Sequence, residues 1–187
     1  KSHLILKISL NGFMKILSFK TSFGKIAVAE NNGLIELVSW TKSGSDKTKL
    51  LLLAKKQLVA YLSGKNKKIA LPRVKTGRKK FDKILNEVSK IPYGKTKSYK
   101  EIALLSKSSP RAVGRVCGKN PLPLIIPCHR VVATNGSLVG YSGRGGLKTK
   151  SKLLMLEKMS KGILIKKNGG TSVMRFGDVP LRGEKPP

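Results

Sequence analysis

Acidic residues are scarce in this chain. Of its 187 residues only 9 are Asp or Glu, against 39 that are Lys or Arg, which gives a formal net charge of +30 at pH 7. So large an excess of one sign destabilises a compact state by self-repulsion, and a polyanionic partner relieves that repulsion. A charge run on one face is often merely solvated, but that reading does not explain an excess over the whole chain. We therefore expect the partner to be nucleic acid.

Cysteine and histidine are equally scarce. The chain has two cysteines, Cys117 and Cys128, and two histidines, His3 and His129. Two thiols exclude a disulfide framework, and this small set of side chains predicts no metal site. Unpaired cysteines are typical of a reducing, intracellular compartment. We therefore expect a cytoplasmic protein, associated with the nucleoid through DNA, or a nuclear one in a eukaryote.

Long apolar runs are also missing. No run approaches the roughly 20 residues that a membrane-spanning helix needs. The opening, KSHLILKISL, is too short and too interrupted by Lys7 to predict a signal peptide. We expect no membrane partner. The hydrophobic share of 40% is nevertheless enough to bury a core, and the length fits one large domain or two small ones.

The N-terminal part of the chain is predicted to form strands and one helix. Asn11-Gly12 and Asn31-Asn32-Gly33 are hairpin signals, and they predict an antiparallel meander built from residues 4–6, 13–17, 25–30 and 34–39. A helix is predicted over residues 49–62. Five apolar positions are expected to hold it on the sheet: Leu51, Leu52, Leu58, Val59 and Leu62.

The composition changes between residues 63 and 79, where many lysines accompany Gly64, Pro72 and Gly77. A polar stretch with such breakers predicts a linker. We therefore expect an N-terminal domain over residues 1–75 and a C-terminal domain over residues 76–168. Residues 169–187 are rich in Gly, Pro and charge, which predicts a flexible tail.

The C-terminal domain is predicted to begin with three helices. Phe81, Ile84, Leu85 and Val88 are spaced i, i+3, i+4, i+7, which places them on one face of the first helix. A capping box formed by Ser98 and Glu101 starts the second helix at Tyr99. Ser109 and Pro110 start the third, which we expect to run to about Lys119.

The third of these helices carries a positive ridge. Arg111, Arg115 and Lys119 recur every four residues, and Ala112, Gly114 and Gly118 keep the helix thin. Two short helices joined by a tight turn, the second of them basic, are typical of a helix-turn-helix. A solvated basic helix gives the same pattern about as often. Each glycine, however, weakens the helix by up to ~1 kcal/mol, and that cost favours a surface that approaches a partner closely.

A candidate nucleophile lies in LPLIIPCHRVV, residues 122–132. The apolar run 124–126 predicts a short buried strand, Pro127 ends it, and Cys128 and His129 follow. On this stretch alone, a reactive thiol and an inert core thiol are evenly balanced. No acidic residue occurs between Glu101 and Glu157. If that segment faces one way, its positive field favours the thiolate of Cys128.

Five collinear blocks now resemble one family, the 6-O-alkylguanine-DNA alkyltransferases. They are IPYGKTKSY at 91–99, SPRAVG at 109–114, NPLPLIIPCHRVV at 120–132, GYSG at 140–143 and KxxLLxLE ending at Glu157. The SPRAVG form is most similar to archaeal members. The first 80 residues match more weakly, through TSFGKIAV, QLVAYLSG and the Leu-Pro pair at 71–72. The loop after GYSG carries two more residues than the usual form, at Arg144 and its neighbour.

The resemblance implies a mixed α/β (α+β) fold with a ribonuclease-H-like N-terminal domain plus a C-terminal winged helix-turn-helix-like domain. It implies a monomer that binds double-stranded DNA containing alkylated guanine and flips the damaged nucleotide out from the minor-groove side. The alkyl group on the 6-oxygen of guanine, and also one on the 4-oxygen of thymine, then passes to Cys128. The resemblance implies no cofactor, and the protein is consumed in one turnover.

The resemblance also assigns roles to residues. Cys128 accepts the alkyl group and His129 takes the thiol proton through a bridging water, because neighbours in an extended chain point apart. Glu157 orients and charge-stabilises His129, and Asn120 holds the turn beneath the thiol. The residues expected at the DNA and the flipped base are Tyr99, Arg111, Ala112, Gly114, Arg115, Lys119, Val131 and Ser142.

Two other classes compete with this reading. A lesion-recognising or regulatory helix-turn-helix protein would bind DNA without chemistry, but relatives of that kind lack the cysteine. The presence of Cys128 together with His129 and Glu157 therefore favours the enzyme. A thiol hydrolase would need an oxyanion hole, and the sequence offers no candidate for one.

Overall fold

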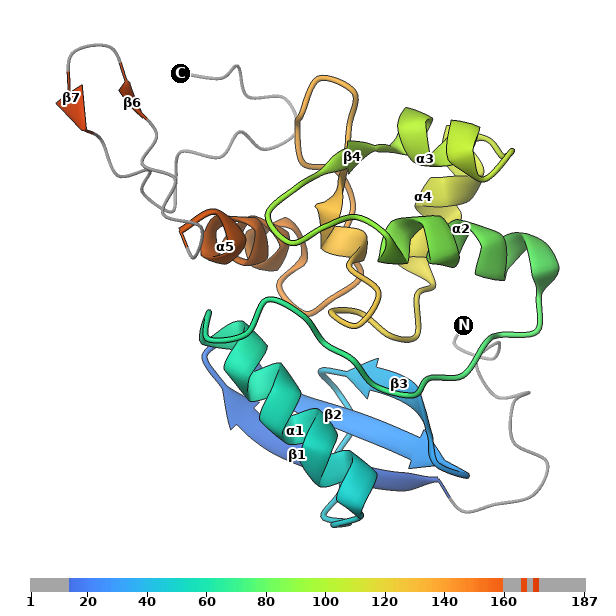
Figure 1. The fold of residues 1–187 in the computed structure, drawn as a ribbon, viewed down its shortest axis with the longest axis vertical. Coiled ribbons are helices and arrows are strands. Elements are labelled where there is room, and N and C mark those ends of the chain that lie inside the picture. The colour runs from blue at the N-terminus through green and yellow to red at the C-terminus, as the bar shows by residue number, and fades with distance from the viewer. Residues whose placement is uncertain (1–13, 160–165, 168–169, 172–187) are drawn as a thin grey trace.

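A sheet layer and a helical layer make up the molecule (Figure 1). The computed structural model describes residues 14–159 and the backbone of two short strands, β6 (Lys166–Lys167) and β7 (Gly170–Thr171). The predicted hairpin turn at Asn11-Gly12 and most of the predicted tail lie outside the described residues. In the part of the chain that is described, no helix is long and apolar enough to cross a membrane.

The sheet layer is an antiparallel meander of three strands. They are β1 (Lys15–Thr21), β2 (Gly24–Asn31) and β3 (Leu34–Ser39), in the order β1-β2-β3. The second predicted hairpin is confirmed. Its turn uses Asn32 at φ 48° and Gly33 at φ 73°, the left-handed conformation that these two residue types adopt most readily. The central strand is buried from Ile26 to Glu30, so both of its faces are covered.

The helix α1 (Lys49–Leu62) covers β1 and β2 (Figure 1). Thr48 caps it by accepting a hydrogen bond of 3.1 Å from the amide of Leu51. The predicted bounds are confirmed, but two of the predicted contacts are wrong, because Leu52 is 46% exposed and Val59 is 39% exposed. The buried stripe runs through residues 51, 54, 58, 61 and 62. Positions 52 and 59 fall one step of about 100° away from it.

The predicted linker has no helix or long strand, but it is held against the sheet. The amide of Ile35 in β3 donates to the carbonyl of Pro72 at 2.9 Å, and the amide of Val74 donates back to Ile35 at 3.0 Å. Further along the same strand, the amide of Val38 donates to the carbonyl of Pro121 at 2.9 Å. An edge strand with unpaired backbone groups invites aggregation. Here two later segments of the chain cover that edge.

Four helices form the second layer: α2 (Lys79–Ser89), α3 (Tyr99–Leu105), α4 (Pro110–Gly118) and α5 (Gly146–Met159). The predicted starts of α3 and α4 follow from local chemistry and are confirmed. The Ser98–Glu101 capping box is present in full, and the Ser109 side chain accepts from the amide of Ala112 at 3.2 Å. The helix α4 ends at Gly118, so Lys119 is its C-cap. Between these helices, β4 (Lys97–Ser98) pairs in parallel with β5 (Val131–Val132).

The strand predicted over residues 124–126 is wrong, because this segment is a buried turn. Leu124 has φ 75°, and the amide of Ile126 donates to the carbonyl of Leu122 at 2.8 Å. Prolines at 121, 123 and 127 lack the amide hydrogen that a ladder needs. Three apolar residues between them are too few to extend. The apolar run therefore predicted burial correctly, but it predicted the wrong backbone conformation.

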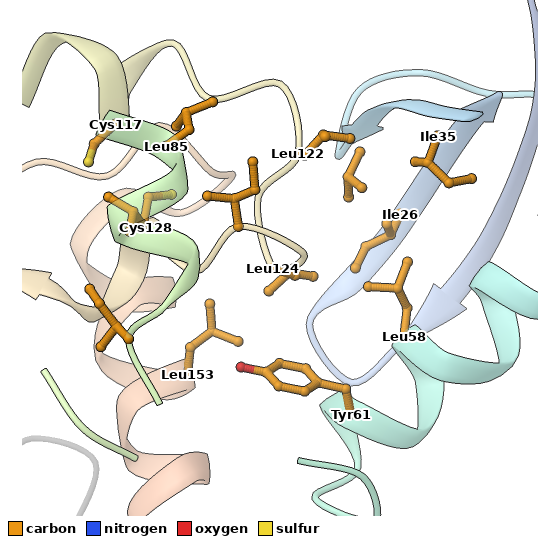
Figure 2. Packing of buried hydrophobic residues seen from close by; sticks show 14 of the residues in the cluster. Ile26, Ile35, Leu58, Tyr61, Leu85, Cys117, Leu122, Leu124, Cys128 and Leu153 are labelled. Carbon is orange, nitrogen blue, oxygen red and sulfur yellow. The ribbon is translucent and has the colours of Figure 1, made fainter. Parts of the chain in front are cut away.

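One hydrophobic core joins the two layers. Leu122 and Leu124, on the buried turn, lie on the side of the core that faces Ile26, Ile35 and Leu58 of the sheet layer (Figure 2). Leu122 is 1% exposed, and all five side chains belong to a single cluster. The sheet layer therefore supports the turn directly, through packed side chains.

We predict that shortening Leu122 destabilises both layers together. Leu122→Ala should lower the free energy of unfolding by about 2–5 kcal/mol, because it opens a cavity in a shared core. Urea unfolding can be followed by fluorescence of Trp40, the single tryptophan, which lies just after β3, and by circular dichroism of the helices. We expect the two signals to shift together. Leu104→Ala, at a position 72% exposed, should change stability by less than about 0.5 kcal/mol. Two separate transitions would contradict a shared core.

Candidate active site around a buried cysteine

Cys128 sits in a tight bend between the buried turn and β5. Residues Cys128–Arg130 form one turn of 3-10 helix, so the extended conformation expected here is wrong. The amide of Cys128 donates to the carbonyl of Ile126 at 2.8 Å. Asn120 clamps the turn that precedes it: its side-chain nitrogen donates to the Ile126 carbonyl at 2.9 Å, and its side-chain oxygen accepts from the Leu122 amide at 3.0 Å. Asn120 thus takes the place beneath the thiol that was predicted for it.

The thiol of Cys128 is only 3% exposed, and its burial decides its charge. Burial raises the pKa of Cys128, while a hydrogen bond from Asn120 and the positive charge of Lys150 lower it in part. The net direction is upward. The positive charge of Lys150 acts in the direction expected of the acid-free segment, but desolvation outweighs it. The resting cysteine is a thiol, and it needs a base at the moment of reaction.

A histidine–glutamate pair follows the cysteine. His129 Nε2 lies 2.7 Å from Glu157 Oε1, and both side chains are fully buried. Burial lowers the pKa of His129, and the hydrogen bond and charge of Glu157 only partly raise it, so the imidazole is neutral. With its proton on Nε2 and directed at the carboxylate, the ring keeps Nδ1 as an acceptor. Nδ1 is buried and has no hydrogen-bond partner among the described residues.

Glu157, near the end of α5, collects donors from several segments. The amide of Gly94 donates to Oε2 at 2.6 Å, and Arg130 Nε lies 3.1 Å from both oxygens. The hydroxyl of Tyr61 donates to Oε1. Burial alone raises the pKa of Glu157, but the hydrogen bond that His129 donates and the charge and hydrogen bonds of Arg130 outweigh burial and lower the pKa to about 2. The carboxylate therefore stays ionised although it is buried.

Three residues at this site escaped the sequence analysis: Tyr61, Arg130 and Lys150. Tyr61 was hidden within the apolar pattern of α1, and Arg130 had no assigned role. Lys150 was counted only as one of many cations, yet it is fully buried. One signal pointed to Lys150: it precedes Glu157 by seven residues, which is two turns along the same face of a helix.

Lys150 connects α5 to two backbone segments, one at Val131 and one at residues 139–140. Its ammonium donates to the carbonyls of Val131 at 2.6 Å, Val139 at 2.9 Å and Gly140 at 3.3 Å. Burial lowers the pKa of Lys150 to about 8, against the opposing effect of Cys128 and Cys117. Val131, whose carbonyl was expected at the base, therefore already accepts one hydrogen bond from the protein.

The residues predicted to contact DNA differ in their exposure. Tyr99 belongs to the buried site: its hydroxyl donates to the Val139 carbonyl at 3.0 Å, and burial followed by the nearby cysteines raises its pKa, so it stays protonated. The exposed residues of α4 and the later loop are Arg111, Arg115, Lys119 and Ser142. Ala112 and Gly114 are half-buried between them. A Cβ added at Gly114 would lie 3.9 Å from the Tyr99 ring, an ordinary contact, so the fold does not itself require glycine there.

The enlarged loop folds into a turn that leads into α5. The amide of Gly146 donates to the carbonyl of Gly143 at 3.0 Å, and the Thr149 hydroxyl donates to the carbonyl of Arg144 at 2.5 Å. A Cβ at Gly143 would meet the Tyr141 ring at 2.3 Å. Tyr141 in turn lies edge-on to Trp40, with ring centroids 6.5 Å apart. The two additional residues are therefore absorbed at the helix start, and Arg144 is exposed.

A surface cavity of about 480 Å³ opens beside α3 and α4. Its lining includes Tyr99, Ala103, Leu104, Pro110, Ala133 and Thr134. Tyr99 of the buried site and Pro110, the first residue of the basic helix α4, therefore lie on the same face of the molecule. Within the residues that the structure describes, no group of three or more His, Cys, Asp or Glu is arranged to hold a metal ion.

Comparisons with known proteins identify similar sequences and a similar structure. The family model described as "6-O-methylguanine DNA methyltransferase, DNA binding domain" matches residues 79–159. The inducible methylated-DNA–protein-cysteine methyltransferase of Bacillus subtilis is 40% identical over 139 residues, which cover 70% of this chain and 76% of that protein. The constitutive one is 33% identical over 155 residues, covering 75% and 93%. The crystal structure of Mycobacterium tuberculosis OGT in complex with DNA superposes with a TM-score of 0.70 at 31% identity, covering 78% of this chain and 94% of that one.

We predict that Glu157 makes the fold sensitive to acid. Its pKa is lowered from 4.5 to about 2 in the folded state, so its contribution is fully present above pH 4.5 and is lost as the pH falls toward 2. Linkage gives a loss of about 2 kcal/mol between pH 6 and pH 3. Glu157→Gln should lack this part of the loss, and the two proteins are compared in a His129→Gln background, because removing Glu157 would otherwise also shift the pKa of His129. Urea unfolding across this pH range measures the difference, and equal slopes for the two proteins would contradict the assignment.

Proposed function

Since this chain belongs to the methylated-DNA–protein-cysteine methyltransferases, we propose that Cys128 is the cysteine that takes the alkyl group. The protein repairs DNA by direct reversal, through transfer of an alkyl group from DNA to a protein cysteine. One observation carries the assignment to Cys128. This thiol directly precedes a neutral imidazole that is oriented by a buried carboxylate and keeps one nitrogen free.

The proposed transfer is a single displacement. His129 Nδ1 takes the thiol proton through a bridging water. Its Nε2–H stays hydrogen-bonded to Glu157, and the carboxylate stabilises the imidazolium that forms. The sulfur attacks the alkyl carbon, the bond from that carbon to the guanine 6-oxygen breaks, and the guanine leaves with the electron pair. Tyr99, which stays protonated, donates a hydrogen bond to N3 of the leaving base, and the proton taken by His129 then neutralises the guanine anion. The carbon–sulfur bond persists, so each molecule acts once and no cofactor takes part.

The target atom lies inside a duplex, so the nucleotide is flipped out first. The exposed basic side of α4 supports an approach through the minor groove, with Arg111 filling the gap in the base stack. Ala112 and Gly114 permit close contact with the backbone, and Arg115 and Lys119 bind phosphates. The Val131 carbonyl and the Ser142 amide receive the polar edge of the base. Val131 keeps a second lone pair for this purpose beside its bond to Lys150.

The finer description of the fold and partner belongs to the same proposal. The covered meander supports a ribonuclease-H-like domain over residues 1–75. The α3–α4 pair with β4 and β5 supports a winged helix-turn-helix-like domain over residues 76–168. We propose a monomer acting inside the cell on double-stranded DNA that contains alkylated guanine, with alkylated thymine as a second substrate.

We predict that Cys128 is the sole acceptor. Incubation with methylguanine DNA should add one methyl group to the intact mass, and peptide mapping should place it on Cys128. Cys128→Ala should abolish the gain. Cys117→Ala is the matched control and should retain it, because burial and the neighbouring Cys128 raise the pKa of Cys117 to about 12 and the helix α4 gives it no adjacent base. A methyl group found on Cys117 would refute the assignment.

We predict that Arg111 serves flipping and not chemistry. Arg111→Ala should slow repair of duplex DNA by about 10- to 100-fold, since it removes the side chain that offsets a flipping cost of a few kcal/mol. The same variant should react normally with free methylguanine base, which needs no flipping. Arg115→Ala should instead weaken DNA binding and leave the saturated rate unchanged. Equal losses on duplex and free base would show that Arg111 acts on the chemistry or the fold.

A further inference from the structure

The sheet layer contributes one side chain to the candidate active site. Tyr61 lies in the last turn of α1, outside the segment that the family model matches, and is 1% exposed. It is 68 residues from His129 and 96 residues from Glu157 in sequence. Its hydroxyl points away from α1, toward the part of the chain that carries Leu153 (Figure 2). The mechanism described above gives this residue no role.

The hydroxyl of Tyr61 contacts three members of the site. It donates its proton to Glu157 Oε1 and accepts a hydrogen bond from Arg130 Nη2 at 3.2 Å. It also lies 3.3 Å from His129 Nε2. Burial first, and then the charge of Glu157, raise the pKa of Tyr61, so it stays protonated and remains a donor. The hydroxyl thus closes a ring of hydrogen bonds around one carboxylate oxygen.

These hydrogen bonds fix the position of the Glu157 carboxylate relative to His129. Glu157 Oε1 is held between the Tyr61 hydroxyl and Arg130, so the carboxylate cannot rotate away from Nε2. Hydrogen-bond partners that hold a carboxylate against a histidine fix both the orientation and the tautomer of its ring. A donor on the carboxylate also disperses its negative charge, which weakens its hold on an imidazolium. The other charges acting on His129 are Arg130, beside it in the 3-10 turn, and Lys150 of α5.

We propose that Tyr61 is a positioning residue for alkyl transfer, whose hydroxyl fixes Glu157 against His129 Nε2 and so leaves Nδ1 as the proton acceptor. This inference rests on the proposed roles of Cys128 and His129. It also means that the segment 79–159 holds an incomplete site, because one hydrogen bond to its carboxylate comes from the sheet layer.

The test compares two tyrosines that lie edge-on to each other. Tyr61 and Tyr93 have ring centroids 5.7 Å apart, and the buried hydroxyl of Tyr93 has no hydrogen-bond partner among the described residues. Tyr61→Phe and Tyr93→Phe therefore remove the same atom from the same aromatic pair, but only the first touches Glu157. Single-turnover transfer from methylguanine DNA would be followed from pH 5 to pH 9, together with DNA affinity and thermal stability.

We expect Tyr61→Phe to slow transfer by about 10-fold or more with unchanged DNA affinity. Its acidic limb should move to higher pH, because a carboxylate that has lost a donor holds the imidazolium more firmly. Tyr93→Phe should match the parent chain in rate and pH profile. A merely structural role would lower the melting temperature of both variants without moving the acidic limb.

Three outcomes would overturn the inference. A Tyr61→Phe variant with the parental rate and pH profile would remove Tyr61 from the mechanism, as would an equal slowing in Tyr93→Phe. The histidine tautomer gives an independent measurement on the unaltered chain. With only two histidines the ¹⁵N spectrum is simple, and a proton found on Nδ1 of His129 would contradict the geometry. If the unaltered chain left Cys128 unmodified, the proposed function would fail as well, and that result is seen before any variant is compared.

Discussion

The site depends on one buried negative charge. The Glu157 carboxylate is fully removed from solvent, and such a group is stable only when charge and hydrogen bonds surround it. Its partners come from the end of α1, from the turn after α2 and from the 3-10 turn that carries the cysteine. Each of these segments is thereby fixed relative to the others. The carboxylate that raises the pKa of His129 is therefore also a contact between the two layers of the molecule.

Burial also explains why the two side chains proposed to react are uncharged. The thiol of Cys128 and the imidazole of His129 are both neutral at rest, since desolvation dominates each of them. A neutral thiol is a weak nucleophile, which favours an arrangement in which proton transfer and attack occur together in the presence of DNA. Asn120 and Lys150 reduce the cost of forming the thiolate without forming it in advance.

Sequence reasoning succeeded where the signal was local. The Ser98–Glu101 box, the Ser109-Pro110 start and the Asn32-Gly33 turn each depend on a few neighbouring residues, and each formed where expected. The blocks around Cys128 and Glu157 singled out Asn120, His129 and Glu157; the fold places His129 against Glu157 and Asn120 against the turn before Cys128, and their roles stay predictions. Sequence reasoning failed for residues 124–126, because an apolar run reports burial and not conformation.

The missed residues share a different cause. Tyr61 and Lys150 act through contacts with chain segments far along the sequence or through backbone carbonyls. Nothing in the local pattern distinguishes a tyrosine that caps a carboxylate from one that fills a core, or a buried lysine from its many exposed neighbours. The pKa of Cys128 depends for a related reason on how deeply the thiol is buried, which the number of nearby cations in the sequence does not report.

Lys150 shows how this chain organises a loop without an exchangeable ion. An ammonium that contacts three carbonyl oxygens occupies the position that a bound monovalent cation takes in other proteins. Here the cation is covalently attached to α5, so it cannot be washed out, replaced by a competing ion or removed by a chelator. The wall of the site that includes Val131, Val139 and Gly140 therefore needs no ion from solution to keep its shape, whereas the affinity for DNA is expected to depend strongly on salt.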